Sequence, residues 1–394
     1  MILNIFYRIL ESVTTLMTVA GMGYFLAAWW AARSFRREQL AAQPRFTPGV
    51  SILKSLRGLD PGMLDAFRSH CQQQYEGEYE LLFGVASMDD PAVAAVQQLQ
   101  REYPEIAIQL IECPQKLGTN GKVSTLVQLE PHAKHPFLLI NDSDITVSAQ
   151  YLQRIMAGFE LPAKGVQVGM VTALYYGRAH ETLGSRLEAL GISTDFQAGV
   201  LLSKKLEGGL SYGLGSTLAV RREAVEKIGG LQVLVDELAD DHLLGVKIFQ
   251  AGYLVELSPE VVETSVAAYD WQGFVDHQLR WARTVRDARP GGYVGMIFTH
   301  GLTWAMINTL ICGFSSASLT LLALSFILRV WLAMTVGAEI LGDEQVHSRL
   351  WMLPLRDAIF FGIWLAGFAG NTVVWRGERF LLRKGRLYPL ETKN

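Results

Sequence analysis

The sequence predicts an α/β domain with a mostly parallel sheet, placed between membrane segments. Short β-rich runs alternate with stretches of helical spacing between Arg33 and Pro290, a pattern typical of parallel sheets with helices on both faces. Outside this region lie apolar runs that reach or approach the roughly 20 residues needed to cross a bilayer. Of the 394 residues, 50% are hydrophobic and 19% are charged, a balance that also favours a membrane protein.

The first apolar run, residues 13–32, contains no charge and is followed at once by Arg33, Arg36 and Arg37. Basic residues in this place indicate a retained anchor over residues 1–33, with its trailing side in the cytoplasm, rather than a cleaved signal peptide. Three widely separated cysteines without a CxxC pair agree with a reducing compartment. No nucleic-acid-binding motif is present, and the net charge of −3 points to no nucleic-acid partner.

The remaining apolar runs lie near the C-terminus, at residues 291–328 and 358–375. We expect a linker at residues 34–48, a cytosolic globular domain at 49–290, membrane or interfacial helices at 291–376 and a basic cytosolic tail at 377–394. Three spans would leave this tail outside, whereas its Arg and Lys residues favour the inside. One segment is therefore expected to be interfacial or re-entrant, and residues 292–310, with their Thr, His and Asn, are the candidate.

The elements of the globular domain follow in a regular order. Pro, Gly and Asp turns separate them, and Pro91 is placed where a helix tolerates it, in the first turn. The expected strands are residues 50–56, 79–86, 106–112 and 137–140, and the expected helices are residues 63–74, 91–102, 122–129 and 149–159.

Two carboxylates, Asp142 and Asp144, follow the fourth strand, which should be central in the sheet. Sheets of this kind bind ligands outside the carboxyl ends of their strands. Strand alternation would point both carboxylates to one side, and their hard oxygens suit Mg²⁺ or Mn²⁺ carrying a diphosphate. An ordinary acidic turn is the alternative, because such pairs also arise by chance.

Asp89 and Asp90 end the second strand, at the same edge of the sheet. They could bind the uracil and ribose of a nucleoside there. The alternative is a helix cap, since Asp before Pro starts a helix well. Both interpretations can hold together.

A second acidic group lies in ELADDHLLG, residues 237–245, where Asp240 and Asp241 precede an apolar helical stretch. Helix capping explains one of the four acids at residues 236–241 but not the whole group. A carboxylate set against helix N-terminal amides could serve as a general base toward an acceptor hydroxyl.

Arginines recur every third residue in HQLRWARTVRDAR, residues 277–289, so they lie along one side of a helix. For Arg283, Arg286 and Arg289 we favour a basic collar against anionic lipid. Arg280 and Trp281 differ, because a guanidinium suits a leaving diphosphate and an indole can stack on a sugar or acceptor.

Taken in order, DDPA, GTNGKVSTL, DSD, ADDHLLG and an RW pair before C-terminal membrane segments resemble ceramide glucosyltransferase and its bacterial relatives, over residues 47–289. LADDHLLG and HQLRWARTVR are especially similar to the hopanoid-associated glycosyltransferases of bacteria. The resemblance implies a GT-A fold and an inverting transfer from UDP-N-acetylglucosamine or UDP-glucose to a membrane lipid, a hopanoid (bacteriohopanetetrol) or ceramide. It also implies a multi-pass protein of the bacterial inner membrane with its catalytic domain facing the cytoplasm.

Donor-binding residues follow from the same resemblance, position by position. Asp90 would hold the nucleoside, and Lys122 would touch the nucleotide. Asp142 with Asp144 would hold Mg²⁺ or Mn²⁺ and the diphosphate, and Asp240 is counted among the donor contacts.

The residues implied for catalysis are Asp241, as general base, and Arg280 with Trp281, as the contact to diphosphate and acceptor. A base on one side of the anomeric carbon and a stabilised leaving group on the other suffice for a single displacement. His277 stands where the resembled family has Gln or Arg and is kept as a donor contact. Ser55 also departs from the family, which often has Pro there.

The acceptor side is less defined. Residues 180–202 are amphipathic in their first half, and we expect them to lie against the membrane and line the acceptor's path. A helix that only packs within the domain is an equal alternative. A processive polysaccharide synthase and a non-enzymatic nucleotide-sugar-binding scaffold are the competing functions.

Overall fold

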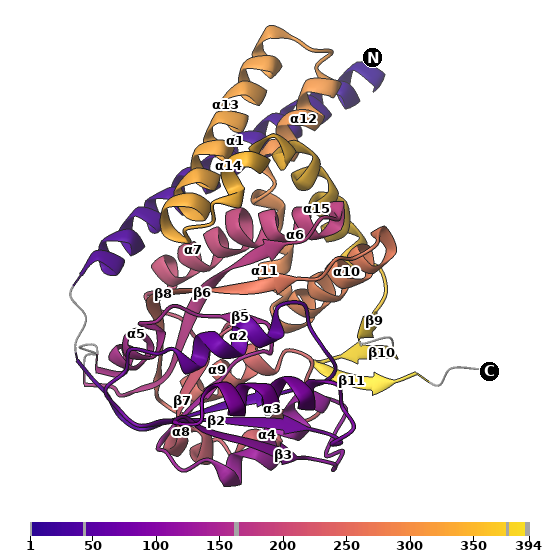
Figure 1. Cartoon of the computed structure of the whole chain (residues 1–394). Helices are drawn as coiled ribbons and strands as arrows, with labels where there is room; N and C mark the ends of the chain where they lie inside the picture. The colour runs from indigo at the N-terminus through magenta and orange to yellow at the C-terminus, as the bar shows by residue number, and fades with distance from the viewer. Residues whose placement is uncertain (1, 42–44, 161–164, 376–377, 391–394) are drawn as a thin grey trace.

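The computed structural model describes the chain except residues 1, 42–44, 161–164, 376–377 and 391–394. Figure 1 shows a group of long helices at one end and an α/β domain at the other, with a layer of helices between them. The predicted α/β fold between apolar helices is confirmed.

The first half of the sheet is parallel, in the order β3-β2-β1-β4. Its strands are β1 (Val50–Ser55), β2 (Tyr79–Val85), β3 (Ala107–Glu112) and β4 (Phe137–Ile140), which confirms the four expected strands. The expected helices are also present, as α2 (Met63–Cys71), α3 (Ala92–Glu102), α4 (Gly121–Leu129) and α5 (Tyr151–Ala157). Every side chain of β4 is buried, as expected for a central strand with helices on both faces.

The second half of the sheet is mixed rather than parallel. Strand β7 (Leu218–Arg221) pairs antiparallel with both β4 and β6 (Val168–Ala179), and β8 (Leu254–Val266) runs parallel to β6. The short β5 (Ile145–Thr146) closes the far edge, giving eight strands in the order β3-β2-β1-β4-β7-β6-β8-β5. The expectation of a mostly parallel sheet therefore applies to its first half, where strands and helices alternate.

Helix α1 (Ile2–Leu40) continues beyond the predicted anchor, so residues 34–40 of the expected linker are helical. It packs on α12 (Gly301–Ile311) through two glycines, since a Cβ on Gly21 would lie 2.1 Å from the Gly301 Cα. Small residues at a helix contact permit this approach in membranes.

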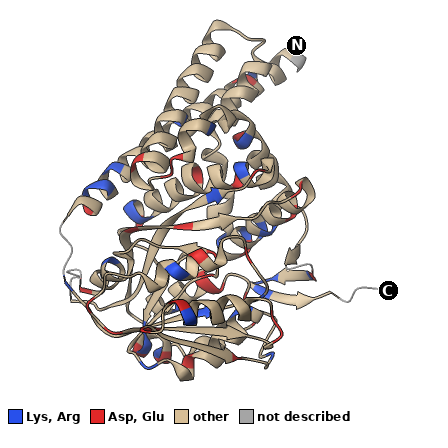
Figure 2. Cartoon of the chain, in the orientation of Figure 1, with Lys and Arg blue, Asp and Glu red and all other residues tan. Residues whose placement is uncertain are grey.

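Within the described residues, three stretches are long and apolar enough to cross a membrane, namely Asn4–Leu40, Ser316–Ile340 and Gln345–Gly367. Pro290–Phe298 and Gly301–Ile311 meet at a bend of 50°, as a broken span or re-entrant loop would, which agrees with the irregular segment expected at residues 292–310. The last span, Gln345–Gly367, begins and ends earlier than the expected run at residues 358–375. Residues 372–375 at the end of that run form a strand instead. Figure 2 shows that α12 and the outer part of α13 (Ser316–Ala333) lack charged residues.

Helix α6 (Leu183–Gly191), a π-helical turn (Ile192–Phe196) and α7 (Gln197–Glu207) form the layer between the sheet and the long helices (Figure 1). Leu187 and Leu190 of α6 are buried against α13 and α15 (Leu353–Gly367). Residues 180–202 thus pack within the protein on both sides, which is the alternative considered for them. Their proposed contact with an acceptor stays a prediction.

Four charged residues meet where the long helices contact this layer, and we call them the interface cluster: Asp195, Arg329, Arg356 and Asp357. The last three are buried, and Asp195 is partly exposed. Arg329 and Arg356 approach Asp357 at 2.8 Å and 3.0 Å, and Arg356 also lies 2.8 Å from Asp195.

The C-terminal segment, expected as a basic tail at residues 377–394, is folded over its described residues. Strands β9 (Thr372–Trp375), β10 (Glu378–Arg383) and β11 (Arg386–Pro389) form a separate antiparallel sheet in the order β11-β10-β9, here called the C-terminal sheet. Its apolar side chains form a small core, which explains why a segment rich in Arg folds into a sheet. Figure 1 shows it beside α10 (Trp271–Ala288), at the flank of the α/β domain.

Candidate functional site

Three of the predicted motifs converge on the ammonium group of Lys122. Its Nζ lies 2.7 Å from Asp142 Oδ1 and 3.6 Å from Asp240 Oδ2. Lys122 stands in the first turn of α4, which begins after Asn120 because the Asn120 side chain accepts a hydrogen bond from the Val123 amide. The Asn120 side chain also donates to the Glu237 carbonyl and to Asp240, so α4 holds the acidic loop directly.

The two carboxylates after β4 have different partners. Strand β4 ends at Ile140, and Ser143 and Asp144 lie in a turn, so strand alternation does not orient them. Asp144 Oδ2 accepts hydrogen bonds from Thr264 Oγ1 (2.6 Å) and the Ser265 amide (3.1 Å) of β8. Burial, together with the charge of Asp142, raises the pKa of Asp144 to about 6.

Lys54, at the carboxyl end of β1, lies beneath these carboxylates. It is 1% exposed, and its ammonium donates to the Asp142 carbonyl oxygen at 3.0 Å. Burial lowers the pKa of Lys54 to about 7, although Asp144 and Asp142 act in the opposite direction. A lysine within an apolar strand is the signal that could have identified this residue from the sequence, because lysine is almost never fully buried without a partner.

Asp241 is in the first turn of α9 (Asp240–Gln250), where Oδ1 accepts a hydrogen bond from the His242 amide at 2.7 Å. Burial and then the charge of Asp240 raise the pKa of Asp241 to about 6, and Lys122 opposes this shift. A carboxyl group with this pKa is matched to proton transfer near neutral pH. A Cβ on Gly215 would come within 2.8 Å of Asp241 Oδ2, so this glycine keeps room beside the carboxylate.

We call the charged residues around Lys122 the site cluster: Lys54, Lys122, Asp142, Asp144, Asp240 and Asp241. Within the part of the chain that the structure describes, no three His, Cys, Asp or Glu side chains are close enough to hold a metal by themselves. Mg²⁺ is commonly bound by one or two carboxylates together with substrate phosphates and water. Asp142 and Asp144 supply hard oxygens in this number, so the residues present fit an ion that is completed by a substrate.

Asp90 has a structural role in its loop. Both carboxylate oxygens accept from the Gly58 amide (3.0 and 3.1 Å), and Oδ1 accepts from the Ala92 amide at 2.9 Å. Asp90 therefore starts α3, as the alternative interpretation held, and also fixes the loop after β1. Its contact with a nucleoside stays a prediction.

Helix α10 carries His277, Arg280 and Trp281, and it is attached to α6 through Glu188. His277 Nδ1 lies 3.1 Å from Glu188 Oε2, and Gln278 Nε2 donates to the same oxygen at 2.9 Å. The Trp281 ring lies 5.4 Å from the His277 ring, measured between centroids. His277, which stands where the resembled family has Gln or Arg, and the glutamine after it thus reach the same buried carboxylate.

The later arginines of this helix have partners within the protein, and their predicted contact with anionic lipid stays a prediction. Arg283 donates to the Thr372 and Ala369 carbonyl oxygens, and Arg286 donates to the carbonyls of Gly367, the last residue of α15, and of Gly370. Arg289 lies 3.3 Å from Glu207. The last carbonyls of a helix lack partners within the helix and attract cations, which explains this placement.

Tyr175, in the second half of β6, lies within electrostatic reach of several parts of the site. Burial raises the pKa of Tyr175 above its usual range, and four carboxylates raise it further. They are Asp241, Glu188, Asp142 and Asp144. The acidic loop, the turn after β4 and the α6–α10 contact therefore all act on the charge of one buried side chain. Neither Tyr175 nor Glu188 belongs to a motif, which is why sequence reasoning missed them.

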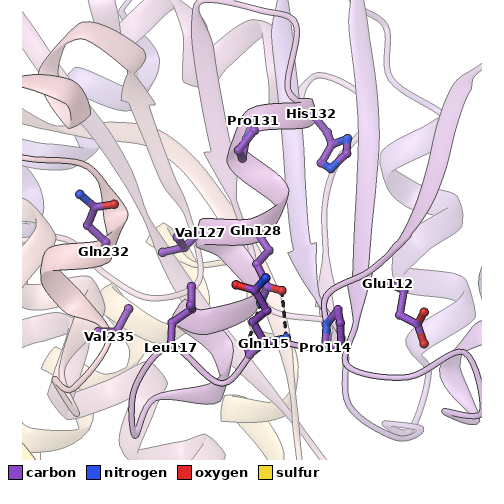
Figure 3. A pocket seen from close by; sticks show the side chains of 10 residues that line it. All are labelled: Glu112, Pro114, Gln115, Leu117, Val127, Gln128, Pro131, His132, Gln232 and Val235. Atoms are coloured by element: carbon purple, nitrogen blue, oxygen red, sulfur yellow. Dashed lines mark hydrogen bonds between the residues drawn. The ribbon is translucent and has the colours of Figure 1, made fainter.

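A hollow of about 710 Å³ lies elsewhere, between the end of β3, α4 and residues 231–235 (Figure 3). Its walls include Glu112, Gln128 and His132, and none of the predicted site residues lines it. The candidate site is therefore defined by the converging motifs and not by this hollow.

The chain is similar in sequence to curated glycosyltransferases. It is 24% identical to ceramide glucosyltransferase 3 of Caenorhabditis elegans over 277 residues, 69% of this chain and 59% of that protein. It is 23% identical to an N-acetylglucosaminyltransferase of Rhizobium meliloti (strain 1021) over 269 residues, 65% of this chain and 61% of that protein. The chain thus spans only about three-fifths of the length of these relatives.

Its fold and family can also be compared. The mannosyltransferase PcManGT from Pyrobaculum calidifontis, solved in complex with GDP-Man and Mn²⁺, superposes with a TM-score of 0.52 at 18% identity, covering 91% of this chain and 99% of that one. This likeness confirms the GT-A-like fold. The family model Glycosyl transferase family 21 matches residues 13–388, nearly the whole chain, and the protein therefore belongs to glycosyl transferase family 21.

Proposed function

We propose that this protein transfers glucose or N-acetylglucosamine from a UDP-sugar to the hydroxyl of a membrane lipid, with inversion at the anomeric carbon. A hopanoid such as bacteriohopanetetrol is the first candidate acceptor and ceramide the second. The observation that carries the proposal is the meeting of Lys122, Asp142, Asp240 and a raised-pKa Asp241 below apolar helices.

The donor would lie across the carboxyl ends of β1, β2 and β4. Lys122 and Arg280 would place positive charge at the diphosphate, and Asp90 would approach the nucleoside. Asp142 and Asp144 would hold Mg²⁺ or Mn²⁺, whose charge would offset the charge of the leaving diphosphate. The solved mannosyltransferase with GDP-Man and Mn²⁺ supports a nucleotide sugar and a divalent ion for this fold.

Asp241 would accept the proton of the lipid hydroxyl. At the same time the hydroxyl oxygen would form a bond to the anomeric carbon, and the bond from that carbon to the diphosphate would break. The raised pKa of Asp241 supports this role, because a base that holds its proton near pH 6 is strong enough to assist yet still ionised at pH 7. Trp281, whose ring lies 6.0 Å from that of Phe196, supplies an aromatic surface for the acceptor on the membrane side.

The membrane arrangement is part of the proposal. Basic residues at the end of α1, among them Arg33 and Arg36, favour a catalytic domain on the cytoplasmic side, where UDP-sugars are made. The bacterial inner membrane is the location that the hopanoid acceptor requires. With up to four spans by length and composition among the described residues, a channel for a growing polymer would have few helices, which disfavours a processive synthase.

The deciding experiment is transfer by detergent-purified protein with Mg²⁺ or Mn²⁺. UDP-glucose and UDP-N-acetylglucosamine are each offered with bacteriohopanetetrol and with ceramide, and products are identified by mass spectrometry. We expect one glycolipid, carrying a single sugar in the inverted configuration. Longer sugar chains would indicate the processive synthase. Donor binding without any glycolipid, from these acceptors and from a total lipid extract, would favour the non-enzymatic scaffold.

A further inference from the structure

The C-terminal sheet is bonded to the acidic loop that carries Asp240 and Asp241. The Leu238 amide donates to the Gly385 carbonyl at 3.0 Å, and the Leu387 amide donates to the Asp236 carbonyl at 3.1 Å. Between these two bonds, Glu237 and Arg386 are paired as neighbouring strands would be. The loop thus acts as an additional short edge strand of this sheet.

Side chains reinforce the backbone pairing. Leu238 is 7% exposed, because its side chain fills the core formed by Val373, Phe380, Leu382 and Leu387. Arg386 Nε lies 3.2 Å from Glu237 Oε1. The Gly385 amide also donates to Asp287 of α10, so the sheet joins the acidic loop to the helix that bears Arg280 and Trp281.

The same sheet faces the donor side of the site cluster. Trp375 and Phe380 line a space of about 40 Å³ whose opposite wall includes Arg57, Thr119 and Lys122. A water molecule takes about 30 Å³ in the liquid, so this space is far too small for a nucleotide. A nucleotide bound to Lys122 beside this space, rather than within it, would lie against Trp375 while the sheet stays docked.

We propose that the C-terminal sheet is the outer wall of the nucleotide site, and that Arg386 is a positioning residue which holds the loop of Asp240 and Asp241 through Glu237. This inference rests on the proposed function in taking the ligand to be a nucleoside diphosphate. Trp375, which is half-buried and packs near the buried ring of Phe380, offers an aromatic face to the base, and aromatic stacking is tolerant of base identity. A ligand held between the sheet and α4 stabilises the docked arrangement, because it binds that arrangement and not the open one.

The first test is limited trypsin digestion of the full-length protein in detergent, with and without UDP and Mn²⁺. Arg379, Arg383, Lys384 and Arg386 provide cleavage sites within the sheet. We expect UDP to slow cleavage there by about fivefold or more. Cleavage that is unchanged or faster at saturating UDP would overturn the proposal, since the sheet would then be independent of the nucleotide or displaced by it.

The second test measures UDP affinity by calorimetry in variants of the sheet. Leu387→Asp places a charge in the buried core around Leu238 and should detach the sheet. Stacking on aromatic side chains strengthens base binding by roughly five- to a hundredfold, so its loss should raise the Kd of UDP by about tenfold. Arg386→Glu should raise the Kd about threefold, as is common for one exposed ion pair, and Glu237→Arg in the same chain should restore it.

Arg379→Glu is the matched control, because Arg379 is exposed on the same sheet, pairs with Val374 and not with Arg386, and changes the charge equally. Its Kd should equal that of the wild type. If the Leu387→Asp protein does not fold, the Arg386→Glu and Glu237→Arg pair decides alone. Wild-type binding of UDP together with unchanged affinity in the folded sheet variants would overturn this inference and leave the proposed function intact. A wild-type protein that binds neither UDP nor UDP-sugars would overturn both.

Discussion

The site cluster and the interface cluster both hold charged residues that are largely shielded from water, except Asp142 with a side chain that is 45% exposed, but their charges balance differently. In the interface cluster, two arginines face two aspartates, and Asp357 lies within 2.8 and 3.0 Å of both arginines. In the site cluster, four carboxylates face two lysines. The pKa values of Asp144 and Asp241 are both raised to about 6, as expected when burial and neighbouring carboxylates disfavour the charged form.

The difference indicates what each group is for. A balanced buried group needs nothing further and fixes how elements pack, here the long helices against the layer of α6 and α7. An unbalanced group with perturbed pKa values is typical of a binding or catalytic site, because the missing charge arrives with the ligand. The excess of carboxylates around Lys122 suits a divalent cation. The two lysines suit the diphosphate that this cation would accompany.

The strongest test of this contrast is Asp241→Asn. The variant keeps the shape of the side chain and loses its basicity, so transfer should fall by about 10²- to 10⁴-fold, the usual range for a general base. UDP affinity should stay within about threefold. Turnover is measured by glycolipid formation and binding by calorimetry.

Asp236→Asn is the control for the Asp241 variant. Asp236 lies in the same acidic loop and accepts from the Thr119 amide at 3.0 Å, a bond that the Asn carbonyl can retain. Its activity should remain close to wild type. Near-normal turnover of Asp241→Asn would show that another group is the base.

A change in the interface cluster should act on stability instead. Asp357→Ala leaves Arg329, which is 2% exposed, without its main partner, and breaking a buried ion pair in this way typically costs about 3–5 kcal/mol. Thermal unfolding in detergent should show a large drop. The double variant Arg329→Met with Asp357→Leu should recover much of the loss, and a stable Asp357→Ala protein would contradict the packing role.

The site cluster could largely be predicted from the sequence, whereas the interface cluster could not. The parallel half of the sheet follows from local alternation, and parallel strands bring their carboxyl ends to one edge. That geometry predicts Asp142 and Asp144 at the edge of the sheet where a ligand would lie, whereas Lys122 and Asp240 are expected in the site only because of the resemblance. The interface cluster joins residues 195, 329, 356 and 357, and no local pattern tells which arginine in an apolar helix faces which aspartate.

The C-terminal sheet and α10 show the same limit. A spacing of three residues gives Arg283 and Arg286 a common side of their helix but not a partner, and their partners are carbonyls more than eighty residues later in the chain. Likewise, Phe380 and Leu387 form a core only with Leu238, so the segment by itself reads as a basic tail.

Removing carboxylates from the site cluster should affect stability less than the change at Asp357. Asp142→Ala and Asp144→Ala relieve repulsion between carboxylates but also remove the Lys122 contact and the bonds from Thr264 and Ser265, so the midpoint of unfolding should fall less than in Asp357→Ala. UDP affinity in the presence of Mn²⁺ should fall by about 10- to 100-fold, as is common when support for a metal site is lost. Affinity measured with EDTA should be similar in the variants and the wild type. Retained stimulation by Mn²⁺ in both variants would rule out the metal role.

The unbalanced cluster should also make the protein respond to pH. Transfer should fall about tenfold per unit below pH 6, because Asp241 must be unprotonated to accept a proton. The pH dependence of stability has the opposite sign to that of transfer, because Asp144 and Asp241 stabilise the folded protein at low pH. The folded pKa values of Asp144 and Asp241 lie above their ordinary value of 3.8, so the folded state binds more protons than the unfolded state between about pH 4 and 6.

Their contribution to the free energy of unfolding is therefore fully present below pH 3.8 and is lost as the pH rises through about 6. Saturating UDP and Mn²⁺ should move this midpoint to lower pH, because a nearby cation favours the charged carboxylates. Unfolding is followed by denaturant titration at several pH values, with Asp144→Asn as the comparison. A midpoint unaffected by the ligand would separate these groups from the donor site.

The smallest effect is expected for changes to the partners of Glu188, a residue that shares features with both clusters. It is 5% exposed, like the interface cluster, yet its partners His277 and Gln278 belong to the helix of the site. His277→Gln introduces a residue that the resembled family has there, and it should change kcat/KM by less than about threefold, because the Gln278 amide still donates to Glu188. Gln278→Ala should cost more, about 1–3 kcal/mol of stability, since a buried acceptor loses a donor. If His277→Gln instead lowered kcat/KM tenfold while Gln278→Ala had no effect on stability, the imidazole would act on the substrate directly and Glu188 would belong with the site cluster.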